Sequence, residues 1–104
     1  MEIYKDGCFE KVYNGDDFNI TLERVKDTIF VHCDVFSFSK SILKKMRTYF
    51  KMLRDFLHSK GFDEIATYTL NKKFAKLIDN SFEVAGEIKW DGGKSIEVLV
   101  WELS

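Results

Sequence analysis

Basic side chains recur in the middle of the chain at a spacing that would bring them together on a helix. They form a basic strip whose members are Lys40, Lys44, Arg47, Lys51 and Arg54, and His58 continues the series. Residues three or four positions apart are neighbours on one face of a helix. Such a strip either forms a solvated helix surface or docks an acidic protein surface, a nucleic acid or the phosphates of CoA.

The charge around the basic strip differs from that of the rest of the chain. Residues 39–60 contain seven Lys and Arg and one acidic residue, Asp55, so this segment carries +6. The whole chain carries −1, so the other residues together carry −7. We therefore expect the five Lys and Arg of the basic strip to bind a protein partner that is acidic. A nucleic acid fits less well, because the strip lacks interleaved exposed aromatic rings on which bases could stack.

A second candidate site overlaps the start of the strip, in the segment DVFSFSKSILKKM at residues 34–46. At such strand-to-helix junctions, glycines commonly let backbone N–H groups approach a phosphate at the positive end of the helix. This junction has no glycine and presents Phe38, Ser39 and Ser41 instead. A serine hydroxyl here could contact a phosphate, or it could cap the helix by accepting a hydrogen bond from a free backbone N–H.

The segment His32-Cys33-Asp34 contains side chains that bind metals or act in catalysis elsewhere. On a strand, His32 and Asp34 share one face while Cys33 points to the other, so Cys33 does not meet His32 directly. No CxxC or HxxxH spacing supports a metal site, and we predict none. With two cysteines in unrelated contexts, a disulfide scaffold is not expected and a reducing compartment fits better.

Strands are predicted in the first third of the chain. Apolar and polar residues alternate over residues 18–25, and a β-branched, apolar run over residues 28–36 suggests a strand covered on both faces. Residues 26–27 read as a tight turn, which makes these two strands antiparallel. Upstream, one or two short strands are expected around Gly7, with a turn at residues 14–15.

A long helix is predicted over residues 39–60, which contain no Gly or Pro. Ser39 or Ser41 can cap its start, and Gly61 is a natural stop because glycine tolerates positive φ. Its apolar face is formed by residues at helical spacing, namely Ile42, Met46, Tyr49, Phe50, Leu53 and Leu57.

The last third of the chain predicts a strand at 65–70, a short helix at 71–79, and strands at 82–90 and 94–103 joined by a hairpin turn at 91–93. The short helix is expected to turn three apolar residues inward, namely Phe74, Leu77 and Ile78.

These elements predict one α/β (α+β) domain spanning residues 1–104, with a mixed, mostly antiparallel twisted sheet, one long helix and one short helix. The crossover through the long helix makes strands 28–36 and 65–70 parallel. The final strand is apolar on both faces, so it should lie inside the sheet.

The composition and the N-terminal segment indicate where in the cell this domain is expected. Hydrophobic residues make up 45% of the 104 residues, an ordinary composition for a folded domain. No apolar run is long enough to span a bilayer, so no membrane partner is expected. The N-terminal segment MEIYKDG lacks the apolar core of a signal peptide, so we expect a cytoplasmic protein.

The order of strands, long helix, strand, short helix and terminal hairpin resembles the C-terminal two-thirds of the GNAT N-acetyltransferase family. The likeness covers roughly residues 18–103 and includes the segments HSKGFDEIATYTL and NKKFAKLIDNSF. It implies that, in an active enzyme, acetyl-CoA would lie at the strand-to-helix junction. The cofactor-binding residues would then be Phe38, Ser39, Ser41 and Asn71.

The sequence departs from the family pattern in two places. Where the family has Arg or Gln followed by small residues, this chain has Phe36 and then serines, or, if aligned on the helix-ending Gly61, the segment SILKKM that starts at Ser41. Neither register restores the motif, and a side chain at a glycine position would crowd a diphosphate. The family's proton-donating Tyr falls at about Ile78, or with a slip of one residue at Leu77 or Asp79. We therefore assign no catalytic residue and expect no cofactor.

The resulting prediction is a non-catalytic GNAT-like binding protein of the small kind encoded by bacteriophages, acting in the host cytoplasm on an unknown protein partner. Binding would use the basic strip or the sheet edge, and a homodimer is left open. One alternative is an acetyl-CoA-dependent N-acetyltransferase with an atypical pyrophosphate loop. A second alternative is a nucleic-acid-binding module that uses the basic helix.

Overall fold

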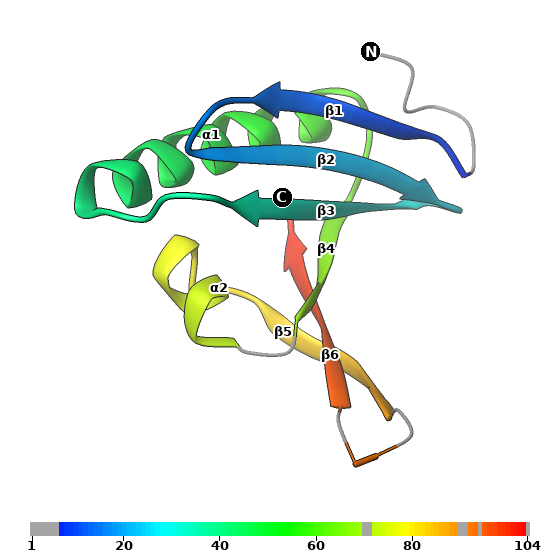
Figure 1. The fold of residues 1–104 in the computed structure, drawn as a ribbon. Helices are drawn as coiled ribbons and strands as arrows, with labels where there is room; N and C mark the ends of the chain where they lie inside the picture. The colour runs from blue at the N-terminus through cyan, green and yellow to red at the C-terminus, as the bar shows by residue number, and fades with distance from the viewer. Residues whose placement is uncertain (1–6, 70–71, 90–91, 94, 104) are drawn as a thin grey trace.

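The computed structural model describes residues 7–69, 72–89, 92–93 and 95–103. In chain order its elements are β1 (Phe9–Asn14), β2 (Phe18–Val25), β3 (Thr28–Val35), α1 (Lys40–Ser59), β4 (Glu64–Thr69), α2 (Lys72–Ile78), β5 (Glu83–Lys89) and β6 (Ser95–Glu102). The six strands form one sheet in the order β1-β2-β3-β4-β6-β5 (Figure 1). The pair β3 and β4 is parallel and the other neighbouring pairs are antiparallel, which confirms the predicted fold class.

Two hairpins build the N-terminal half of the sheet. The turn between β2 and β3 lies at the predicted place, and Lys26 adopts a positive φ of 54° there. The turn after Asn14 is confirmed as well, since the Gly15 N–H donates to the carbonyl oxygen of Phe18 at 3.0 Å. One of the expected N-terminal strands is β1, while residues 1–6 lie outside the described part of the chain.

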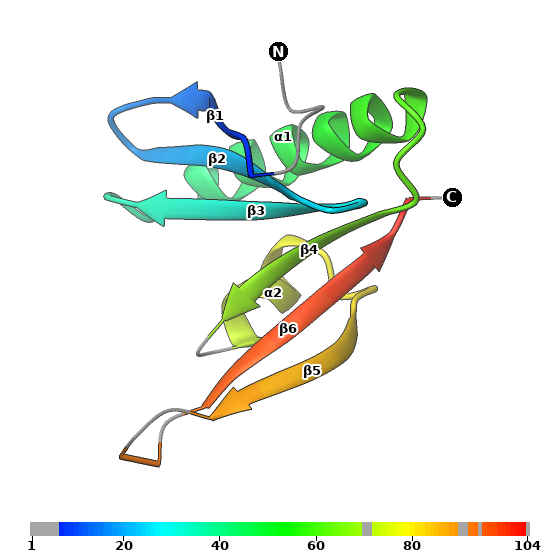
Figure 2. The same ribbon diagram turned by 90° about the vertical axis from the view of Figure 1, so that its right-hand side faces the viewer.

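Helix α1 begins and ends as its sequence predicts. Ser39 caps the N-terminus, and Gly61 follows the helix with φ of 91°, a conformation that glycine adopts without the steric penalty of a Cβ. The apolar face packs on the sheet, with four buried residues, namely Met46, Phe50, Leu53 and Leu57. Ile42 and Tyr49 are partly buried against the same core. Both helices lie on one side of the sheet (Figure 2).

The sheet opens between its two central strands. β3 and β4 pair through Ile29 with Ile65 and Phe30 with Ala66, and they diverge beyond these pairs (Figures 1 and 2). The expectation that β3 is covered on both faces is wrong for its second half. Residues 29–31 are buried, but Cys33, Asp34 and Val35 are exposed because no strand pairs with β3 on its β4 side there.

Helix α2 is rotated from the predicted orientation. Phe74 and Ile78 pack against the core as expected, but Leu77 is 43% exposed and Ala75 takes the buried position. Phe74, Ala75 and Ile78 fall on one side of a seven-residue helix, and Leu77 falls on its flank. The prediction for Leu77 was therefore wrong.

The C-terminal hairpin completes the sheet. β6 lies between β4 and β5, which confirms its predicted internal position. Its helix-side residues Leu99 and Trp101 are buried, and the Trp101 ring meets Phe50 of α1 edge-on at 5.0 Å between centroids. β5 forms the outer edge, all seven of its residues are exposed, and an irregularity interrupts its pairing between Val84 and Gly86.

Candidate functional site

The strand-to-helix junction is built around the Ser39 hydroxyl. Its oxygen accepts a hydrogen bond from the Ile42 N–H at 3.2 Å, which is the N-cap contact, and lies 3.0 Å from the Ser41 hydroxyl oxygen. Of the two roles left open by the sequence, the structure shows the helix cap. Ser39 is therefore engaged with the helix itself at the position where a phosphate would lie in an anion-binding junction.

The backbone of the junction is also engaged. The carbonyl oxygen of Asp17, in the turn between β1 and β2, accepts hydrogen bonds from the N–H groups of Phe36 at 2.7 Å and Ser37 at 3.1 Å. These two amides are directed toward the β1–β2 turn. No pattern of residue types predicts this contact, because it joins backbone groups that lie about twenty residues apart.

Asp17 is itself held in place by two side chains and one backbone amide. Its carboxylate accepts hydrogen bonds from the Phe18 N–H at 2.8 Å, the Tyr13 hydroxyl at 3.2 Å and the Lys45 ammonium at 3.2 Å. Desolvation opposes ionisation of Asp17, but the hydrogen bonds from Lys45 and Phe18 outweigh it, so its pKa is lowered. The ionised Asp17 thus fixes the turn against α1.

Two phenylalanines surround this junction. Phe36 is 62% exposed and Phe38 is 54% exposed. The Phe38 ring meets Phe74 of α2 edge-on, with 6.2 Å between centroids, so it links the junction to the second helix. Exposed phenylalanine rings therefore flank the junction, and the amides of Phe36 and Ser37 and the hydroxyl of Ser39 already have partners within the chain.

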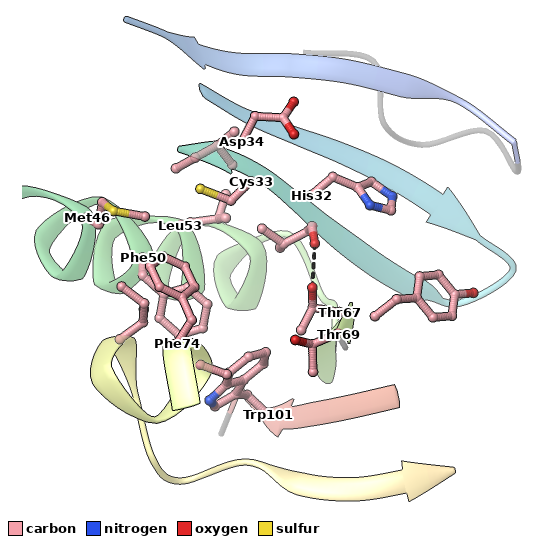
Figure 3. A pocket seen from close by; sticks show the side chains of 15 residues that line it. His32, Cys33, Asp34, Met46, Phe50, Leu53, Thr67, Thr69, Phe74 and Trp101 are labelled. Atoms are coloured by element: carbon pink, nitrogen blue, oxygen red, sulfur yellow. Dashed lines mark hydrogen bonds between the residues drawn. The ribbon is translucent and has the colours of Figure 1, made fainter. Parts of the chain in front are cut away.

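A pocket of about 300 Å³ lies where β3 and β4 diverge (Figure 3). Its apolar wall comes from both helices and from β6, and includes Met46, Phe50, Leu53, Phe74 and Trp101. Its polar wall comes from the two diverging strands, and includes His32, Cys33, Asp34, Thr67 and Thr69. The Thr67 hydroxyl donates to the Val31 carbonyl oxygen at 2.8 Å across the opening. Such a pocket can hold a small apolar group.

The reactive side chains in this pocket are not arranged for nucleophilic chemistry. Desolvation, together with the neighbouring Asp34 carboxylate, raises the pKa of the Cys33 thiol to about 11, so it stays protonated at neutral pH. His32 Nε2 lies 2.9 Å from Glu23 Oε1. The pairing register places Cys33 opposite Ile20 and His32 opposite Thr21, which confirms that the two side chains point to opposite faces.

The position expected for a catalytic acid is occupied by a structural contact. Ile78 lines the pocket and has no proton to give. Asp79 accepts hydrogen bonds from the Arg54 guanidinium and from the N–H of Ser81 at 2.9 Å. Desolvation favours its neutral form, but the hydrogen bonds from Ser81 and the charge of Arg54 outweigh it, so the pKa of Asp79 is lowered. Asp79 is thus a carboxylate at neutral pH.

The basic strip lies along the side of α1 that faces α2. Arg47 donates from Nε to the Leu77 carbonyl oxygen at 2.6 Å, and Arg54 donates to Asp79 and, at 2.7 Å, to the Glu102 carbonyl oxygen. Lys40, Lys44 and Lys51 are exposed. Two of the five predicted partner-binding residues therefore also hold α2 and β6 in place.

The structure brings Phe38, Ser39 and Ser41 together at the junction, whereas Asn71 lies outside the described residues. Within the described part of the chain, no group of three or more His, Cys, Asp or Glu side chains could hold a metal ion. No helix among the described residues is long and apolar enough to cross a membrane.

Comparison with known proteins shows similarity in structure alone. No family model and no curated protein sequence matches the chain. Among solved structures, it is similar to an aminoglycoside 6'-acetyltransferase type Ii, with a TM-score of 0.69, 12% identity, and coverage of 92% of this chain and 68% of the enzyme. It is also similar to the ribosomal-protein-S18-alanine N-acetyltransferase from Escherichia coli, with a TM-score of 0.64 and 15% identity. That match covers 92% of this chain and 70% of the enzyme. A Bacillus subtilis acetyltransferase in complex with CoA is similar with a TM-score of 0.59 and 14% identity. That match covers 92% of this chain and 76% of the enzyme.

These similarities show that the chain has the GNAT acetyltransferase fold, as the order of its elements suggested. At 12% to 15% identity they show the fold alone. The chain spans 68% to 76% of the length of these three enzymes.

Proposed function

We propose that this GNAT-fold chain is a non-catalytic binding protein that acts through contact with another protein. The observation that carries the proposal is the closed strand-to-helix junction. The Ser39 hydroxyl oxygen accepts a hydrogen bond from the Ile42 N–H. The Asp17 carbonyl oxygen accepts hydrogen bonds from the N–H groups of Phe36 and Ser37. A coenzyme diphosphate would have to displace these contacts and the two exposed phenylalanine rings.

The second support comes from the opposite side of the pocket. A leaving thiolate needs a nearby group that carries a transferable proton at neutral pH. Ile78 has none, and Asp79 is an ionised partner of Arg54. The two departures lie in different elements and are independent of each other. We extend the proposal to a phage-encoded protein that acts in the host cytoplasm, which rests on the departures from the family motifs.

One observation favours an alternative, an acetyl-CoA-dependent N-acetyltransferase. The pocket of about 300 Å³ at the divergence of β3 and β4 is lined by apolar side chains and threonines and could hold an acyl group. This alternative requires the junction to rearrange around the coenzyme.

Binding of acetyl-CoA and CoA distinguishes the two functions. Isothermal titration and thermal unfolding of the wild-type chain should show no binding, whereas a ligand at ~100 times its dissociation constant would stabilise the fold by about 2.7 kcal/mol. The Bacillus subtilis acetyltransferase, whose structure contains CoA, serves as the positive control. Dissociation constants in the micromolar range for the wild-type chain would favour the enzyme and reject the proposal.

A further inference from the structure

Charge is unevenly divided between the helices and the rest of the molecule. The segments Lys40–Ser59 and Lys72–Ile78 contain nine Lys and Arg and one acidic residue, Asp55, so the two helices carry +8. The whole chain carries −1, so the remaining residues carry −9. Both helices lie on one side of the sheet (Figure 2), so the positive charge is concentrated on that side.

Part of this charge holds the fold together. Lys45 pairs with Asp17, Arg54 with Asp79, and Lys72 with Glu97. Each pair connects a helix to a strand, a turn or the other helix. Among the described residues, four further helix lysines have no salt bridge, namely Lys40, Lys44, Lys51 and Lys76. Their charge is available to a partner.

A groove of about 530 Å³ lies between α1, the end of α2 at Ile78 and Asp79, and Leu103, which follows β6. Its basic wall is formed by the side chains of Arg47, Lys51 and Arg54. Ile78 supplies apolar surface within it, and Leu103, which is 5% exposed, also lines it. Arg47 and Arg54 are held there by the carbonyl oxygens of Leu77 and Glu102, so the basic wall is ordered before any partner arrives.

We propose that this two-helix face, made of Lys40, Lys44, Arg47, Lys51 and the adjoining groove, binds an acidic protein segment that carries an apolar side chain. The inference rests on the proposed binding role and specifies its surface and partner chemistry. Carboxylates of the segment meet the lysines, and the apolar side chain enters the groove beside Ile78 and Leu103. Charge complementarity of this kind also speeds association and makes it sensitive to salt.

Two features of the groove favour a protein over a nucleic acid. Asp55 and Asp79 also line it, and they would repel a continuous row of phosphates, whereas a peptide can place its carboxylates away from them. The apolar surface of the groove cannot be covered by a sugar-phosphate backbone, which is polar and charged. Phe36 and Phe38 do expose rings beside the first turn of α1, so single-stranded DNA is included in the test.

The test measures fluorescence anisotropy with a labelled Glu-rich peptide that contains a central leucine. A peptide with serine in place of leucine and a single-stranded oligonucleotide are compared with it. The variant Lys44→Glu/Lys51→Glu reverses two exposed lysines of the two-helix face. Its matched control, Lys11→Glu/Lys89→Glu, makes the same charge change on the exposed strands β1 and β5. Circular dichroism and thermal unfolding establish that both variants are folded.

We expect the wild-type chain to bind the leucine peptide more tightly than the serine peptide or the oligonucleotide. The helix variant should weaken binding by about tenfold or more, and the strand variant by less than about twofold. Equal losses in both variants, tighter binding of the oligonucleotide, or no binding of the peptide would each overturn the inference. Coenzyme titration remains a separate test: if acetyl-CoA binds while the peptide also binds at this face, the non-catalytic role fails and the docking surface stands.

Discussion

Arg54, near the end of α1, and Asp79, directly after α2, form an ion pair that links the two helices. Arg54 also donates to the carbonyl oxygen of Glu102 at the end of β6, and the carbonyl oxygen of Asp79 accepts from the Trp101 indole N–H at 3.0 Å. The pair thus connects α1, α2 and β6. It occupies a position next to the one where the family resemblance places a proton donor.

Breaking this pair should destabilise the fold. Each of Arg54→Met and Asp79→Asn should lower the free energy of unfolding by about 1 kcal/mol, toward the low end for a broken ion pair because the side chains are 25% and 23% exposed. Urea unfolding measures the loss, and the double variant should lose less than the sum of the two. Asp27→Asn, which alters the fully exposed partner of Arg24, is the control and should change little. Additive losses would show that the two side chains do not act together.

The same ion pair predicts that the free energy of unfolding falls at acidic pH. The pKa of Asp79 is lowered from its ordinary value of 3.8, since hydrogen bonds from Ser81 and the charge of Arg54 outweigh the desolvation that opposes ionisation. A carboxyl group with a lowered folded-state pKa stabilises the fold fully above its unfolded value and loses that contribution as pH falls through the folded value. The wild-type chain should therefore lose more stability than Asp79→Asn between about pH 5 and pH 2. Parallel stability curves for the two proteins would contradict this.

The helix cap predicts that the two serines of the junction contribute differently to stability. Ser39→Ala removes the oxygen that accepts from the Ile42 N–H and should cost about 1 kcal/mol of unfolding free energy. Ser41→Ala leaves that contact in place and should fall within about 0.5 kcal/mol of the wild type. Chemical denaturation of the two variants measures the difference. If Ser41→Ala were the more damaging change, Ser39 would not be the cap.

Cys33 should react slowly with alkylating agents. The thiolate is the reactive form, and desolvation with the nearby Asp34 charge raises the pKa of Cys33 from 9.0 to about 11. In a Cys8→Ser variant, where Cys33 is the remaining thiol, the rate with iodoacetamide should still rise steeply between about pH 9 and pH 10. A small-molecule thiol measured alongside provides the reference. Levelling of the protein's rate near pH 9 would mean that the thiol is not desolvated.

Local patterns were enough to predict most elements of this fold. Ser39 and Gly61 mark the ends of α1 because a cap and a positive φ are properties of single residues. The parallel pairing of β3 and β4 followed from the crossover through α1. Leu77 was misplaced because a helix as short as α2 offers two apolar orientations, and packing on the core chose the one that buries Ala75.

The candidate site was less predictable than the fold. The residues of the junction and of the basic strip could be named, but their contacts depend on groups far along the chain. The Asp17 carbonyl oxygen accepts from the N–H groups of Phe36 and Ser37, and the Leu77 carbonyl oxygen accepts from Arg47. These acceptors belong to the backbone, which every residue has, so residue types do not predict them. Sequence patterns therefore identify candidate groups, and the tertiary structure decides which of them are already engaged.

The narrow pairing between β3 and β4 has a mechanical consequence. The two halves of the sheet, three strands each, are joined by two residue pairs, by hydrogen bonds from the hydroxyls of Thr28 and Thr67, and by the stacked rings of Phe30 and Tyr68. Such a joint can twist without breaking either hairpin, and amide hydrogens on its two sides should exchange with solvent as separate cooperative groups. α1 packs against both halves, with Tyr49 on Phe18 and Phe50 on Trp101, so it is the element that connects the two groups.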